Sequence, residues 1–65
     1  MKFKHASYSL AYSECGRFER RTSTMQVLRK DYFNVWEVET GKHIAAGFSA
    51  DDVSKQCDRY LERQQ

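Results

Sequence analysis

The sequence predicts an α+β domain in which one C-terminal α-helix packs on one face of a four-stranded antiparallel β-meander. Apolar and polar residues alternate over residues 6–13 and 32–48, Gly41 interrupts the second stretch, and a capped amphipathic pattern covers residues 49–62. A period of two is typical of half-buried strands, whereas spacings of three and four residues are typical of helices. A chain of 65 residues suffices for one domain, so we expect residues 1–65 to form a single α+β unit.

The helix is predicted by its start signals and its apolar stripe. Ser49 suits the N-cap position, because its hydroxyl can accept a hydrogen bond from an unpaired backbone N–H of the first turn. Asp51 and Asp52 then fall in that turn, where the helix dipole favours negative charge. Phe48 and Val53 occupy the positions of a hydrophobic staple. The stripe has i, i+4, i+7, i+8 spacing and consists of Val53, Cys57, Tyr60 and Leu61.

The last two strands, Tyr32–Glu39 and Lys42–Phe48, are predicted to form a hairpin. A two-residue loop would force positive φ on β-branched Thr40, which is unfavourable. A three-residue loop, Glu39–Gly41, requires a left-handed conformation only at Gly41. We therefore expect the three-residue loop.

This loop fixes the register of the hairpin. It places Trp36 opposite Ile44 and Tyr32 opposite Phe48, and a slip of one residue would move every side chain to the other face. We expect the helix to cover the face that the register makes most apolar, which consists of Tyr32, Trp36, Val38, Ile44, Ala46 and Phe48.

Two earlier strands complete the predicted meander. Residues 6–13 alternate, with Ala6, Tyr8, Leu10 and Tyr12 on the expected buried face. A turn at Cys15-Gly16 places Ala6 opposite Met25 in a strand over residues 18–28. A second turn at Lys30-Asp31 then places Met25 opposite Trp36, which puts Met25 and Val27 on the buried face.

The other sheet face is expected to be the outer one. Most of its residues suit water, but four apolar side chains fall among them, and such a cluster suggests a contact surface. A register error, a β-bulge or coverage by the N-terminal tail would be the alternative explanation. The four are Phe18, Leu28, Phe33 and Val35.

Charge is unevenly distributed along the chain. Residues 1–30 carry seven basic and two acidic groups, whereas residues 31–65 carry four basic and seven acidic groups. A basic half can mark contact with polyanions. An ordinary solvated surface is the alternative explanation.

Several chemistries are not supported by the residues present. Cys15, Cys57, His5 and His43 lack the paired spacing of zinc ligands. A Cys15–Cys57 disulfide is disfavoured in a reducing compartment, and isolated glycines form no phosphate-binding loop. We expect no enzyme, cofactor or metal. The N-terminal residues contain no apolar run long enough for a signal peptide. The longest weakly polar run, Ile44–Phe48, is too short to cross a membrane, so we expect a cytoplasmic protein without membrane contact.

Two functions remain, both of a small binding module. In the first, the outer face binds single-stranded nucleic acid, with aromatic rings stacking on bases and arginines following phosphates. The predicted element order is similar to that of PUR repeats and Whirly-type proteins, which bind single strands, although no motif is shared. In the second, the same face or an open sheet edge binds a second copy of the chain, forming a homodimer, or another protein, as a small phage- or plasmid-type adaptor or inhibitor would. The candidate binding residues are Arg17, Phe18, Arg20, Arg21, Leu28, Arg29, Phe33 and Val35.

Overall fold

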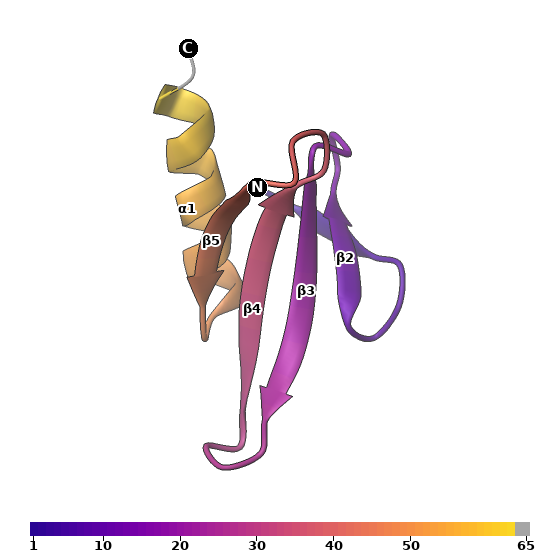
Figure 1. The fold of residues 1–65 in the computed structure, drawn as a ribbon, viewed down its shortest axis with the longest axis vertical. Coiled ribbons are helices and arrows are strands. Elements are labelled where there is room, and N and C mark those ends of the chain that lie inside the picture. Colours follow the sequence, from indigo (N-terminus) through magenta and orange to yellow (C-terminus); the bar gives the residue numbers. More distant parts are fainter. Residues whose placement is uncertain (64–65) are drawn as a thin grey trace.

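A five-stranded antiparallel meander and one C-terminal helix make up the fold of the computed structural model, which describes residues 1–63 (Figure 1). Sequence neighbours pair throughout the sheet, in the order β1-β2-β3-β4-β5. The predicted α+β meander with a helix on one face is therefore confirmed, with one strand more than expected. The elements are β1 (Phe3–His5), β2 (Leu10–Ser13), β3 (Phe18–Met25), β4 (Lys30–Glu37), β5 (His43–Gly47) and α1 (Ala50–Arg63).

The additional strand, β1, takes up part of the chain that was expected to precede the sheet. It pairs with β2, and the loop over residues 6–9 is closed by hydrogen bonds from the Ala6 and Ser7 N–H groups to the Leu10 carbonyl, at 2.8 and 3.1 Å. Serine favours such turns because its hydroxyl competes for backbone groups. The strand predicted over residues 6–13 is thus wrong in its first half, and Tyr8 is 85% exposed instead of buried.

The β2–β3 hairpin has the predicted register. Ala11 lies opposite Arg20, which is the alignment that a turn at Cys15-Gly16 requires. Gly16 has a φ of 73°, and its N–H donates to the Ser13 carbonyl at 2.9 Å. The Ser13 hydroxyl also accepts a hydrogen bond from the Phe18 N–H at 3.0 Å, which fixes the first residue of β3.

The β3–β4 hairpin turns earlier than predicted. Its loop spans residues 26–29, so that Met25 pairs with Lys30 and not with Trp36. Arg29 supplies the left-handed position of this loop, with a φ of 52°. Lys30 and Asp31, the predicted turn, instead extend β4. Val27 in the loop is 96% exposed, so its predicted burial was wrong.

The β4–β5 hairpin has the predicted register away from its loop, but the loop and the strand next to it differ from the prediction. Val35 lies opposite Ala45, as predicted, whereas a bulge pairs Trp36 with His43 and leaves Ile44 as the extra residue. The loop has four residues, 38–41, since β4 ends at Glu37 and the Glu37 N–H donates to the Lys42 carbonyl at 2.8 Å. Positive φ at Gly41, 71°, is confirmed.

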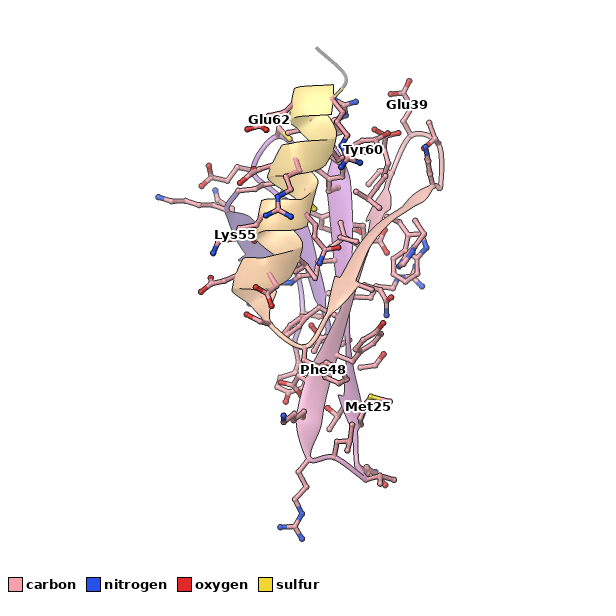
Figure 2. The ribbon with its side chains drawn as sticks, turned by 90° about the vertical axis from the view of Figure 1, so that its left-hand side faces the viewer. Met25, Glu39, Phe48, Lys55, Tyr60 and Glu62 are labelled. Carbon is pink, nitrogen blue, oxygen red and sulfur yellow. The ribbon has the colours of Figure 1, made fainter. Side chains whose placement is uncertain are left out.

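The helix covers one face of the sheet, beside β4 and β5 (Figures 1 and 2). Val53 and Cys57 of α1 are fully buried against it, and Tyr60 and Leu61 pack at its margin, so the predicted stripe is confirmed. The Tyr60 ring meets the Phe18 ring edge-on, with centroids 6.0 Å apart. We call this side the covered face; it consists of Ala11, Ser13, Phe18, Arg20, Phe33, Val35, Glu37 and Ala45.

The predicted choice of face was therefore wrong. Except at the bulge, where His43 takes the place predicted for Ile44 and Ile44 packs against the core, the side chains were grouped as predicted. The helix, however, packs on the group of Phe18 and Val35, not on that of Trp36. Small residues explain this choice, because they let a helix approach closely. Ala45 is buried in the contact. Gly47 contributes less, because a Cβ added there would make only an ordinary van der Waals contact, 3.6 Å from Val53 Cγ1.

Candidate binding site on the open face

The side of the sheet away from α1 carries a band of aromatic and basic side chains. Strand register places its members on one face, and Met25 is seen there in Figure 2. Phe48, just after β5, joins it through contact with Tyr32. We call this side the open face; its strand residues are Lys4, Leu10, Tyr12, Glu19, Arg21, Ser23, Met25, Lys30, Tyr32, Asn34, Trp36, His43 and Ala46.

Trp36 is held by two neighbours on this face, His43 and Arg21. The His43 ring lies against it, with centroids 5.3 Å apart, and His43 Nε2 is 3.0 Å from Asn34 Oδ1. The Arg21 guanidinium lies over the indole at 5.6 Å from its centroid and also donates to the Glu19 carboxylate. These contacts hold the indole in place while leaving it partly exposed.

A second ring pair lies farther along β4. Tyr32 and Phe48 meet edge-on, with centroids 5.1 Å apart and planes inclined by 63°. Phe48 is 50% exposed, as is expected of a ring that has a neighbour on one side only. Together with Trp36, these rings form a discontinuous aromatic surface along one side of β4 and β5.

The charge of the open face is positive. Lys4, Arg21 and Lys30 contribute cations, and Glu19 is the acid that register places among them. Beyond Trp36 the face ends in a hollow of about 380 Å³, which is lined by Glu19, Arg21, Trp36, Glu37, Val38 and Gly41. Both carboxylates in this hollow are paired with an arginine.

Glu37, the last residue of β4, is one of the residues that line the hollow. Its carboxylate accepts hydrogen bonds from Thr40 Oγ1 at 2.8 Å and Arg17 Nε at 3.1 Å. The Thr40 hydrogen bond, followed by the bond and charge of Arg17, lowers the pKa of Glu37 below its ordinary value. The acid therefore stays charged, and it anchors the β4–β5 loop to the start of β3.

The predicted binding residues are not brought together by the fold. Phe18 and Val35 lie in the core, fully buried, and cannot contact a ligand on the surface. Arg20 and Phe33 also belong to the covered face. The burial of Phe18 and Val35 corrects the prediction for these two residues, whereas Arg20 and Phe33 line a pocket on the covered face. The physical cause of all four placements is the choice of face by the helix.

The remaining four predicted residues are exposed but scattered. Arg21 alone belongs to the open face. Arg17 pairs with Glu37, and its guanidinium is 5.8 Å from the Phe18 centroid. Leu28 and Arg29 lie in the loop of the β3–β4 hairpin.

The aromatic members of the open face were missed because they were assigned to the core. The signal was present, since alternation grouped Tyr32, Trp36 and Phe48 on one side. What alternation does not contain is which of two apolar faces a helix covers.

A metal site, a membrane-spanning helix and a disulfide are absent from the described part of the chain. Within residues 1–63 no group of three His, Cys, Asp or Glu side chains is placed to hold a metal ion. The same residues contain no helix with the length and apolar content needed to cross a membrane. Cys15 is exposed and Cys57 is buried, and both thiols are free.

Comparisons with family models, with curated proteins and with solved structures give no match to this chain.

Proposed function

We propose that this chain is a non-enzymatic binding module and that its open face binds single-stranded nucleic acid. The observation that carries the proposal is the combination of partly exposed rings with cations on one sheet face: Trp36 lies beneath Arg21, and Tyr32 lies against Phe48. Proteins that bind single strands without sequence preference combine such stacking rings with a positive surface. Free thiols at Cys15 and Cys57 fit a reducing compartment such as the cytoplasm.

Each part of the face has a role in this proposal. Phe48 and the exposed part of the Trp36 indole offer ring surface to separate bases, and stacking on an aromatic side chain contributes about 1–3 kcal/mol per base. Lys4, Arg21 and Lys30 approach phosphates. For three phosphate contacts on a single strand, the slope of log K against log salt is about −2.

The test uses Trp36, which is the chain's single tryptophan. A mixed-sequence DNA strand of roughly ten nucleotides, within the usual range of site sizes, is added while Trp36 fluorescence is followed at about 50 mM salt, where polyanion contacts are strong. Stacking on the indole quenches its emission. Repeating the titration at higher salt gives the slope.

Two variants and a matched control assign the binding to the open face. Phe48→Ala should weaken binding roughly 5- to 150-fold, as loss of one stacked base predicts. Arg21→Ala should reduce the salt slope by about 0.7. Lys55→Ala removes the same charge from the exposed side of α1 and should change neither (Figure 2). An unchanged Trp36 spectrum at about 50 mM salt would end the proposal.

A second copy of the chain is the other candidate occupant of the open face. It is favoured by the apolar side chains exposed on or beside that face, Tyr12, Met25, Val38 and Phe48, because contiguous apolar patches mark interaction surfaces. Sedimentation at increasing protein concentration distinguishes the two. A mass that doubles, and that Phe48→Ala returns to the monomer, would assign the face to self-association.

A further inference from the structure

A pocket lies on the opposite side of the sheet from the open face, beside the start of α1. The β3–β4 hairpin continues past the first residues of the helix, so part of the covered face has no helix above it (Figure 1). The pocket there has a volume of about 530 Å³, within the range of roughly 300–1,000 Å³ that small-molecule sites occupy. Its lining includes His5, Tyr8, Arg20, Thr22, Phe33 and Ala50.

Arg20 is the unusual member of this pocket. It is 7% exposed, and its guanidinium lies between two rings, 5.0 Å from the Phe3 centroid and 5.2 Å from that of Phe33. Nε is buried without a hydrogen-bond partner, and no acid within residues 1–63 forms an ion pair with this arginine. Burial lowers the pKa of Arg20, as desolvation of a cation requires.

A buried cation without a counter-charge is costly, and native proteins ordinarily pair it. The two phenylalanine rings supply cation–π attraction, but they leave the donors of the guanidinium edge unmatched. The arginine that lines this pocket is therefore prepared for an acceptor that the described residues do not provide.

The start of the helix adds to the positive electrostatic potential that Arg20 creates in the pocket. Ala50, the first residue of α1, lines the pocket. N–H groups of a helix's first turn have no acceptor within the helix, and they carry a partial positive charge. Acidic groups oppose this field: Asp31 lines the pocket and accepts a hydrogen bond from Thr24 Oγ1 at 3.2 Å, and Asp51 and Asp52 are exposed in the first helical turn.

We propose that the pocket binds a small organic anion, whose carboxylate or phosphate oxygens contact Arg20 while its apolar body lies against Phe33 and Tyr8. The planar guanidinium suits both oxygen groups, because it can donate two parallel hydrogen bonds. The volume exceeds what an inorganic ion fills, and the aromatic lining suits an apolar body. This site is separate from the nucleic-acid surface, since the sheet lies between them.

The experiment records amide resonances of the intact chain during titration with four probes: phenyl phosphate, benzoate, inorganic phosphate and neutral phenol. Phenyl phosphate or benzoate should shift the amides of His5, Thr22 and Ala50 saturably, and bind more tightly than inorganic phosphate or phenol. The ratio of the two organic anions identifies the preferred oxygen group. Equal binding of phenol, or no saturable shift with either organic anion, would overturn the proposal.

Variants of Arg20 and Asp31 test whether the charges that line the pocket determine the affinity for the anion. Arg20→Met should weaken binding at least about tenfold, since it removes charge-assisted hydrogen bonds. If this variant does not fold, Arg20→Lys keeps the charge but lacks the planar fork, and binding should still weaken severalfold. Asp31→Asn should tighten binding about two- to fivefold, because it removes a like charge from the rim. Affinities unchanged in Arg20→Lys and Asp31→Asn would contradict the assignment.

Discussion

The covered face and the open face of this sheet are built from the same alternating strands, yet they have different surroundings. On the covered face, Phe18 and Val35 are completely buried beneath α1. On the open face, Trp36 and Tyr32 are only partly buried and contact neighbouring rings, arginine or histidine. Each face contains enough apolar area to form a core, but one helix can cover only one of them.

The difference teaches that how closely α1 can approach the sheet, and not the size of the aromatic rings, decides which face becomes the core. Ala45 is buried beneath α1, where its small side chain lets the helix lie close to β5. Trp36 and Tyr32 carry polar groups that require partners when buried, and on the open face they remain in reach of water. The larger rings thus lie where a ligand can reach them.

The comparison is tested most severely by removing one phenylalanine from each face. Phe18→Ala deletes a fully buried ring and should cost about 3–5 kcal/mol of unfolding free energy, which is much of the stability of a small domain. Phe48→Ala removes a half-exposed ring and should cost about 1 kcal/mol or less. Urea unfolding measures both. Equal losses would mean that the faces are not distinguished by burial.

A second pair of variants enlarges a small residue on each face. Ala45→Leu inserts three carbon atoms beneath α1, where Ala45 is buried, and should destabilise by about 1–3 kcal/mol through overpacking. Ala46→Leu places the same group on the open face, opposite Asn34, and should change the stability by about 0.5 kcal/mol or less. Thermal melts of the two variants provide the comparison. If Ala45→Leu were tolerated as well as Ala46→Leu, close approach would not explain the choice of face.

The pH dependence of the unfolding free energy tests the role of Glu37, which lies at the edge of the covered face. The pKa of Glu37 is lowered from 4.5, first by the Thr40 hydrogen bond and then by Arg17. A group whose folded pKa is depressed stabilises the fold above its unfolded pKa, and this stability is lost as pH falls through the folded value. The unfolding free energy of the native chain should therefore fall below pH 4.5, and more steeply than that of Glu37→Gln.

Glu19→Gln is the control for this measurement, because it removes an acid that contacts Arg21 on the open face. Its unfolding free energy is measured over the same pH range by urea titration. A pH profile of Glu37→Gln that parallels the native one would show that Thr40 and Arg17 do not hold the carboxylate in solution.

The smallest effect on stability is expected from modification of Cys15. Its pKa is lowered, first by the hydrogen bond with the Ser13 hydroxyl, whereas burial raises the pKa of Cys57 to about 11. Because the thiolate is the reactive form, iodoacetamide at mildly alkaline pH should modify Cys15 alone. The melting temperature of the singly modified chain should be nearly unchanged. Mass spectrometry of fragments shows which thiol reacted, and early modification of Cys57 would contradict its burial.

Much of the fold was available from the sequence, because local rules determine it. Ser49 with Asp51 and Asp52 predicts the helix start, and Gly41 predicts a left-handed turn position. The pairing of Ala11 with Arg20 follows from the turn at Cys15-Gly16. Each of these depends on a few neighbouring residues, whose backbone preferences act without the rest of the fold.

What could not be predicted depends on contacts between distant elements. The short strand β1 has no strong pattern of its own and exists because β2 offers it an edge. The turn after Met25 lies where the β3–β4 ladder can add Thr24 opposite Asp31, and not where composition suggested. The candidate site followed the choice of face, so only Arg21 of the predicted binding residues lies on the open face.

The bulge at Ile44 has a consequence for how this hairpin tolerates changes in length. The loop between β4 and β5 is one residue longer than expected, and the bulge takes up that residue before Ala45 meets Val35. The predicted three-residue loop, 39–41, followed by a regular strand at Ile44 would give the same pairing of Val35 with Ala45 from the same number of residues. Insertions and deletions at this end of the molecule can therefore be absorbed within a few residues, and Tyr32 and Phe48 at the other end need not move.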